Sequence, residues 1–235
     1  DIVIFVGGVS PSLEGEEMGV DLPGFRKGDR TEIELPEVQR QFIQALRNAG
    51  KKVVFVNCSG SPIAIEPEVN SCDAILQAWY PGQSGGKAVA DVLFGDYNPS
   101  GRLPVTFYKN ISQLPDFENY DMKGRTYRYM EEDPLFVFGY GLSYTTFQYE
   151  NPTTNKTTIK AGESVTLKIP VSNTGTRNGE AVIQVYLHKK GGNKGPVKTL
   201  RAFKRIYIQA GETENIEFNL TSKQLEWWNK NTQSV

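Results

Sequence analysis

Histidine is nearly absent from this chain, which has a single one, His188, among its 235 residues. A Ser-His-Asp or Cys-His catalytic device, a histidine-rich zinc site or a haem pocket would each depend on that one side chain. Cysteine is almost as scarce, since only Cys58 and Cys72 are present. We therefore expect any chemistry to rest on carboxylates, lysine, tyrosine or cysteine, and we expect neither a metal nor a cofactor.

An excess of charge of either sign is missing as well. The sequence has 26 Lys and Arg against 27 Asp and Glu, and its formal net charge is −1. That balance is not typical of a nucleic-acid-binding protein or of one held to anionic lipid by bulk charge. No run of 18 apolar residues occurs, so we expect no membrane span. The chain starts without Met or a signal-peptide pattern, and we expect a fragment of a longer polypeptide.

The first half of the sequence alternates strand-like and helix-like segments. The first apolar run is continuous, which is typical of a strand buried on both faces. Gly50 and Gly95 suit the ends of the helices that precede them. This order of elements predicts an α/β three-layer sandwich with a mainly parallel sheet over residues 1–113. The predicted elements are strands at 2–6, 53–56, 73–79 and 102–107 and helices at 36–49 and 85–94.

The second half carries strand signals only. Apolar and polar residues alternate in several short segments separated by turn residues, which predicts an antiparallel β-sandwich over residues 146–235. Pro170 falls inside one of these segments and is expected on an edge strand or at a bulge. Residues 114–145 have no clean period but many aromatics, so we expect an ordered connector rather than a solvated tether. The predicted strands are 165–171, 183–187, 202–208 and 216–220.

Three loops should meet at the carboxyl edge of the parallel sheet, where ligands gather in such folds. They follow the first three predicted strands and comprise residues 7–35, 57–61 and 79–82. The first is long for a strand-to-helix connection, and loops of that length are often functional.

The first loop carries Glu14, Glu16 and Glu17 beside glycines. Repulsion among these carboxylates favours the protonated form of one of them, which is what a general acid requires. The alternative is a solvated acidic loop. Arg30 could clamp a substrate or form an ion pair, and its spacing favours the ion pair. Trp79 could stack on a sugar face or seal an interface between domains.

Two further chemistries are disfavoured. Residues 82–87 fail the phosphate-loop pattern, because Pro81 stands where it needs glycine and Ala88 where it needs Ser or Thr. Cys58 and Cys72 are expected at opposite ends of neighbouring parallel strands, roughly 15 Å apart. That separation exceeds the reach of a disulfide, so we expect unpaired structural thiols.

Several long motifs resemble glycoside hydrolases of family 3. Residues 7–18 and 28–31 are similar to the family's catalytic-acid loop, and residues 13–18 are more similar to its β-xylosidase branch than to its β-glucosidase branch. The other segments that carry the resemblance are 80–86, 90–104 and 138–145.

The resemblance implies an exo-acting, retaining β-glycosidase of three parts. An absent N-terminal barrel would supply an Asp nucleophile, the α/β domain would supply the general acid/base Glu, and a fibronectin type III-like (immunoglobulin-like) domain lacking its last strand would follow. Matched to the family's motif, Glu16 is the acid/base and Glu14 the second choice. Arg30 and Trp79 are the candidate substrate-binding residues.

The resemblance also implies a plant oligosaccharide as substrate, a barrel domain of the same enzyme as partner and a secreted or periplasmic location. It implies that this chain alone does not turn over. Two alternatives stay open at this point: a carbohydrate-binding or adhesion module, and a degenerate relative that acts only as a scaffold.

Overall fold

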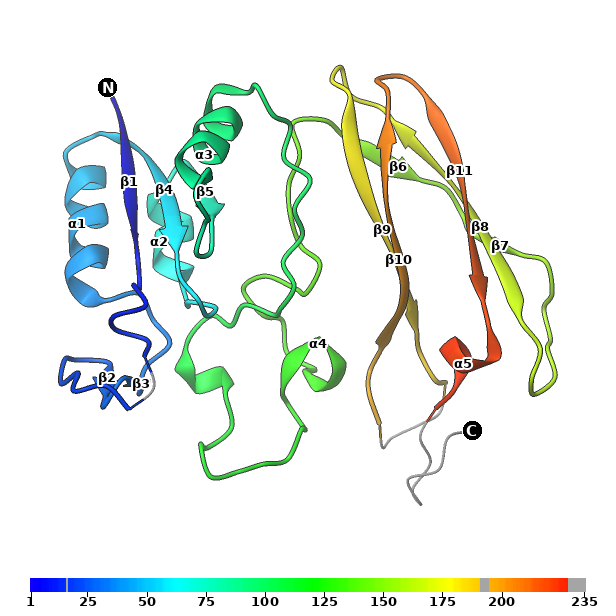
Figure 1. Ribbon diagram of the computed structural model, residues 1–235, viewed down its shortest axis with the longest axis horizontal. Coiled ribbons are helices and arrows are strands. Elements are labelled where there is room, and N and C mark those ends of the chain that lie inside the picture. The colour runs from blue at the N-terminus through cyan, green and yellow to red at the C-terminus, as the bar shows by residue number, and fades with distance from the viewer. Residues whose placement is uncertain (16, 191–194, 228–235) are drawn as a thin grey trace. The chain divides into compact units, whose positions relative to one another are not determined.

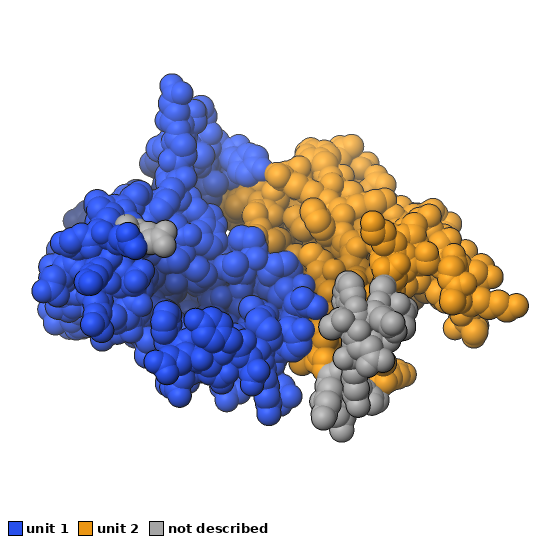
Figure 2. All heavy atoms as spheres, turned by 60° about the horizontal axis from the view of Figure 1, so that its bottom comes forward, with its two compact units in different colours: residues 1–97, 103–138 blue, residues 98–102, 139–235 orange. Residues whose placement is uncertain are grey.

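The computed structural model describes residues 1–15, 17–190 and 195–227. These fold into two compact units, coloured separately in Figure 2. Unit 1 contains Asp1–Tyr97 and Leu103–Phe138, and unit 2 contains Asn98–Arg102 and the chain from Gly139 onward. The segment 114–145 is therefore divided between the units. None of the helices in the part that the structure describes is both long and apolar enough to cross a membrane.

Unit 1 is built on a parallel sheet, as the alternation of strands and helices predicts (Figure 1). Its strand order is β1-β4-β5, and β1 pairs with β4 from Ile2↔Lys52 to Gly8↔Cys58. Gly50 and Gly95 follow helices α1 and α3 with φ of 71° and 83°, the conformation that glycine adopts without strain. The elements are β1 (Ile2–Gly8), α1 (Glu37–Asn48), β4 (Lys52–Cys58), α2 (Glu66–Ser71), β5 (Ala74–Gln77) and α3 (Gly85–Phe94).

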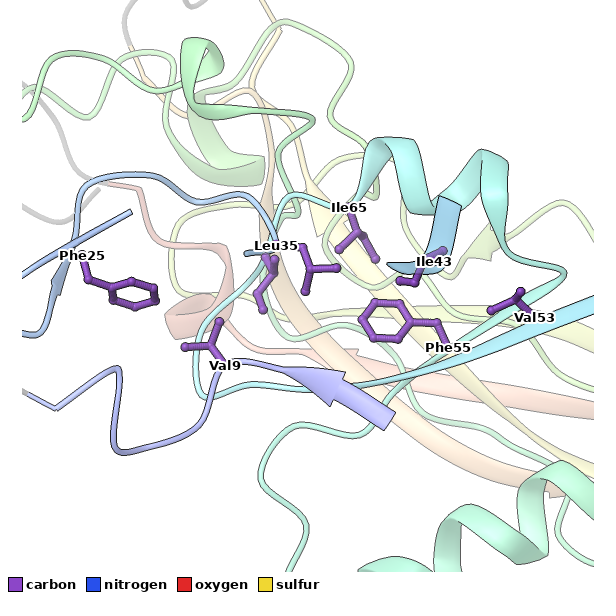
Figure 3. Close-up of a cluster of buried hydrophobic side chains, with 8 residues drawn as sticks. Val9, Phe25, Leu35, Ile43, Val53, Phe55 and Ile65 are labelled. Carbon is purple, nitrogen blue, oxygen red and sulfur yellow. The ribbon is translucent and has the colours of Figure 1, made fainter. Parts of the chain in front are cut away.

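The core of unit 1 joins the sheet, helix α1 and the loop after β1. Val53 and Phe55 of β4 are fully buried and pack with Ile43 of α1. Val9 and Phe25, both from the loop, belong to the same cluster (Figure 3). Because burial of such side chains contributes about 1.5–3 kcal/mol each, the loop is anchored in the core.

The prediction that β1 is buried on both faces is wrong for the residues described. Ile2, Ile4 and Val6 are 65%, 49% and 63% exposed, while Phe5 on the opposite face packs against the rings of Phe42 and Phe55. Successive side chains of a strand alternate between faces, and here only the face toward α1 is covered.

The strand predicted at 102–107 does not form. Only an isolated antiparallel bridge between Phe107 and Phe136 is present, and Pro104 lacks the N–H that a sheet ladder needs. Helix α2 was not predicted, since its six residues, EPEVNS, have no apolar period. The connector contains the short helix α4 (Thr126–Tyr129), and the short helix η1 (Ile111–Gln113) directly precedes the connector.

Unit 2 is an antiparallel sandwich, as the alternating pattern predicts. One sheet pairs β9 with β10, and the other has the order β11-β8-β6, with β7 also on β8. Their inner faces share a core that includes Val171, Ile183 and Phe218. The expected loss of the last strand concerns the end of the chain, outside the residues described. The elements are β6 (Phe147–Tyr149), β7 (Thr153–Thr154), β8 (Val165–Asn173), β9 (Gly179–Leu187), β10 (Thr199–Ile208), β11 (Thr213–Leu220) and α5 (Ser222–Leu225).

Pro170 lies in β8, which is a central strand and not an edge strand. The partner on one side is interrupted at this point, because β6 ends at Tyr149 and β7 begins at Thr153. The missing N–H of proline therefore leaves no hydrogen bond of the sheet unmade. The interruption between β6 and β7 accommodates the proline in place of the expected bulge.

Candidate active site

Hydrogen bonds fix the backbone at the point where the loop after β1 leaves the sheet. The amide side chain of Gln39 makes two hydrogen bonds to the backbone of Gly8: the Gly8 N–H donates to Oε1 at 2.8 Å, and Nε2 donates to the Gly8 carbonyl at 2.7 Å. The Val9 N–H donates to the Cys58 carbonyl at 2.9 Å. Gly8 has a φ of 125°, and a Cβ there would overlap the Cys58 carbonyl. Only glycine therefore fits at this exit.

A short hairpin then returns the loop to its starting point. Strands β2 (Phe25–Arg26) and β3 (Asp29–Arg30) pair through a turn at Lys27 and Gly28, whose φ values are 54° and 88°. A Cβ at Gly28 would overlap the carbonyl of Gly15, so the turn rests directly on the acidic segment. The hairpin thereby brings Arg30 beside Glu14.

The carboxyl group of Glu14 joins all three loops at the carboxyl edge of the sheet. From the loop after β4, the Gly60 N–H donates to Oε2 at 3.0 Å and the Ser61 hydroxyl donates to Oε1. From the loop after β5, the Tyr80 hydroxyl lies 2.7 Å from Oε2 and 2.8 Å from the Val9 carbonyl, and it can donate to one of them at a time. The predicted meeting of the three loops is confirmed.

Arg30 completes this arrangement. Its Nη1 lies 3.6 Å from Glu14 Oε1, and both side chains are only 12% exposed. The guanidinium also donates to Ser61 Oγ at 3.1 Å and to the backbone carbonyls of Glu32 and Glu34 at 3.1 and 3.0 Å. All three acceptors belong to the protein itself. We call the set of Glu14, Arg30, Gly60, Ser61 and Tyr80 the Glu14 clamp.

Arg30 and Tyr80 both remain hydrogen-bond donors to Glu14 or its partners at neutral pH. Burial lowers the pKa of the Arg30 guanidinium, and the Glu14 carboxylate opposes that shift, so Arg30 remains a cation. Desolvation, followed by the hydrogen bond to Glu14, raises the pKa of Tyr80 to about 12. At neutral pH Tyr80 is therefore a protonated donor.

Glu16, the residue matched to the family's acid/base, lies outside the residues described. Its neighbours on both sides are described. Gly15 is packed so closely against the Met18 side chain that a Cβ would overlap the sulfur, and Glu17 is exposed with a φ of 53°.

Trp79 lies at the same edge of the sheet and has a φ of 57°, which is uncommon for a residue other than glycine. Its ring is partly buried and lies 6.0 Å from that of Phe107 in an edge-to-face arrangement. This contact is within unit 1. Stacking of Trp79 on a sugar stays a prediction.

The cysteines and the histidine are not part of the Glu14 clamp. Cys58 and Cys72 are unpaired, as the strand geometry predicts. Burial raises the pKa of Cys58, and burial followed by the charges of Glu68 and Asp73 raises that of Cys72 to about 11. His188 is exposed. Within residues 1–15, 17–190 and 195–227, no group of three or more His, Cys, Asp and Glu side chains is placed to hold a metal ion.

Sequence reasoning did not identify the partners of Glu14 and Gly8. The topology places the loops that contain Gly60, Ser61 and Tyr80 at the carboxyl edge, and this position is the feature of the sequence that points to them. No feature of the sequence links Gln39 to Gly8, because Gln39 lies in the first turn of a helix 31 residues further along the chain.

Comparisons with known proteins agree along the whole chain. Residues 1–144 match the glycosyl hydrolase family 3 C-terminal domain, and residues 181–235 match the fibronectin type III-like domain. The chain is 58% identical over 233 residues to a xylan 1,4-beta-xylosidase of Xylanibacter ruminicola, an alignment that covers 99% of this chain and 27% of that protein. It is 39% identical to a periplasmic beta-glucosidase of Salmonella typhimurium, covering 98% of this chain and 30% of the relative.

Solved structures give the same result. A beta-glucosidase from Erythrobacter marinus matches with a TM-score of 0.86 and 34% identity, over 100% of this chain and 31% of that one. The beta-glucosidase from Listeria innocua matches with a TM-score of 0.83 and 30% identity, over 100% of this chain and 33% of the other. This chain thus spans about a third or less of the length of these relatives.

Proposed function

This chain belongs to glycoside hydrolase family 3, and we propose that it forms the C-terminal part of an exo-acting, retaining β-glycosidase. The enzyme would release single β-linked sugars from the ends of oligosaccharides. An N-terminal barrel of the same polypeptide would hold most of the sugar and supply an Asp nucleophile. The chain described here would supply the general acid/base.

We propose β-xylosides as the substrates. The relative at 58% identity is named a xylosidase, and the relative at 39% identity a glucosidase. The acidic segment at residues 13–18 is also more similar to the β-xylosidase branch. A secreted or periplasmic enzyme suits polymer-derived substrates, and the glucosidase relative is named periplasmic.

We assign the acid/base role to Glu16. In the first step, protonated Glu16 gives its proton to the glycosidic oxygen while the barrel Asp attacks the anomeric carbon and the leaving sugar departs. In the second step, Glu16 takes a proton from water, whose oxygen displaces the Asp carboxylate. The two carboxyl groups of a retaining enzyme lie about 5–5.5 Å apart.

One observation carries this proposal: the side chain of Glu14 ties all three loops together at the carboxyl edge of the sheet. Ligands of parallel α/β sheets bind at that edge. The acidic segment that begins at Glu14 is therefore anchored at the edge where a substrate would lie.

The test is Glu16→Ala in the full-length enzyme, assayed on xylobiose and cellobiose. Loss of a general acid costs about 10²–10⁴-fold in kcat, and we expect that loss on xylobiose. Glu17→Ala is the matched control, because it removes the adjacent, exposed glutamate and should keep most of the activity. Full activity of Glu16→Ala would overturn the assignment of the acid/base. A preference of the unmodified enzyme for cellobiose over xylobiose would overturn the choice of substrate. The 235-residue chain alone should hydrolyse neither sugar.

A further inference from the structure

The carboxyl group of Glu14 is largely buried and has several polar partners, yet the proposed chemistry does not use it. Its two oxygens meet a backbone N–H, two hydroxyl groups and a guanidinium, all from unit 1. An exposed acidic loop needs none of these contacts. Only 12% of the side chain is exposed, so it has little surface to offer a substrate.

We propose that Glu14 and Arg30 are positioning residues for the glycosidase reaction, and that they act by holding the backbone that precedes Glu16. This inference rests on the proposed function, because it takes Glu16 as the acid/base. It assigns to Glu14 a role distinct from proton transfer.

The first step of the argument is mechanical. Gly15 is the only residue between Glu14 and Glu16, and it is held from both sides, by the hairpin turn at Gly28 and by the Met18 side chain. Glu14 fixes the position that precedes it: its side chain binds the loops after β4 and β5, and its N–H donates to the Ser10 carbonyl at 3.2 Å. The backbone leading into Glu16 has little freedom as long as Glu14 keeps its partners.

The second step concerns what the loss of Glu14 would do. Arg30 would remain charged and mostly buried, and would keep only the weaker attraction of Glu34 in place of its ion pair with Glu14, which is unfavourable. The Gly60 N–H would lose its acceptor at 3.0 Å. The loop would relieve both defects by moving toward water. A displacement of about 1 Å at a catalytic group can cost about 100-fold in rate.

The third step separates positioning from general stability. Arg40 and Glu68 form another buried ion pair of unit 1, with Nε 2.8 Å from Oε1 and Glu68 only 1% exposed. This pair joins α1 to α2, and neither residue contacts the Glu14 clamp. Glu68→Ala therefore removes a comparable carboxylate from the same unit without touching the acidic loop, and is the matched control.

The experiment uses the full-length enzyme and two substrates, xylobiose and 2,4-dinitrophenyl β-xyloside. Xylobiose needs a proton on its leaving oxygen, whereas dinitrophenolate departs without one. We expect Glu14→Ala to lower kcat/KM on xylobiose by about 100-fold, with a far smaller loss of kcat/KM on the dinitrophenyl substrate. The comparison uses kcat/KM because it reports the step that forms the glycosyl intermediate, whereas the second step needs Glu16 as a base for both substrates. Arg30→Met should show the same selectivity. Glu68→Ala should affect both substrates equally.

A milder variant guards against misfolding. Tyr80→Phe removes one donor and leaves Gly60, Ser61 and Arg30 in place, so it should give a smaller but equally selective loss of kcat/KM. Equal losses of kcat/KM on both substrates would overturn the positioning role. If Glu16→Ala is inactive on xylobiose while Glu14→Ala is normal, the positioning role alone fails. If Glu16→Ala is fully active, the proposed function fails.

Discussion

The hydrogen bond from Gly60 to Glu14 gives a prediction that does not depend on enzymatic activity. The Gly60 N–H donates to a charged acceptor at 3.0 Å, and it lies in an irregular loop where no sheet neighbour protects it. Glu14→Ala removes that acceptor. The amide of Gly60 should then exchange with solvent much faster.

The size of the effect follows from the contacts. Hydrogen bonds to charged groups contribute about 1.5–3 kcal/mol, and each 1.4 kcal/mol is a factor of ten in an equilibrium. The Tyr80 hydroxyl can turn to the Val9 carbonyl at 2.8 Å, so its loss is partly compensated. We therefore expect protection at Gly60 to fall by about 10- to 150-fold.

Hydrogen exchange read by mass spectrometry on peptides covering residues 8–18 and 57–61 measures this directly. Both peptides should lose protection together in Glu14→Ala, because one carboxyl group holds both loops. Glu68→Ala should leave both unchanged. Unchanged protection in Glu14→Ala, or loss in only one of the two peptides, would refute the reasoning.

Three further predictions concern single residues of unit 1. In an absorbance titration, Tyr80 should ionise near pH 12, about two units above an ordinary tyrosine, and Tyr80→Phe should remove that last phase. Because the pKa of Tyr80 is raised in the folded state, any free energy of unfolding that Tyr80 contributes is complete below pH 10 and is lost as the pH rises through about 12. A loss of stability near neutral pH that Tyr80→Phe abolishes would contradict this direction. Cys72, with a pKa of about 11, should react with a thiol reagent at pH 8 more slowly than a free cysteine, since the thiolate is the nucleophile, and rapid reaction in the native state would count against its burial. Gly28→Ala should lower the free energy of unfolding by about 1–3 kcal/mol in urea, because φ is 88° and the methyl group would meet the Gly15 carbonyl, whereas a neutral result would mean that the hairpin does not rest on the acidic segment.

Periodicity was sufficient for the elements that bury one regular face. Helices α1 and α3 end shortly before Gly50 and Gly95, as the sequence predicts, because a left-handed glycine is a local signal. The alternating segments of unit 2 form strands for the same reason. Short elements such as α2 gave no pattern, since six residues are too few to show a helical period.

The errors arose where the outcome depends on neighbours in space. The apolar run of β1 cannot tell which of its faces is covered, and Ile2, Ile4 and Val6 lie on the exposed one. The acidic loop presented a similar difficulty. Topology placed the three loops at one edge, but it could not say that Glu14 faces Arg30 and Tyr80, because that depends on the hairpin that folds Arg30 back.

The most direct test of the central claim is the product that Glu16→Ala forms from 2,4-dinitrophenyl β-xyloside in the presence of azide. If Glu16 is the acid/base, the glycosyl intermediate still forms with this leaving group, and the small anion then occupies the vacated space and attacks it. We predict that azide restores turnover and that NMR identifies β-xylosyl azide, with retained configuration. Turnover that azide does not change, with xylose as the sole product, would contradict the assignment of Glu16.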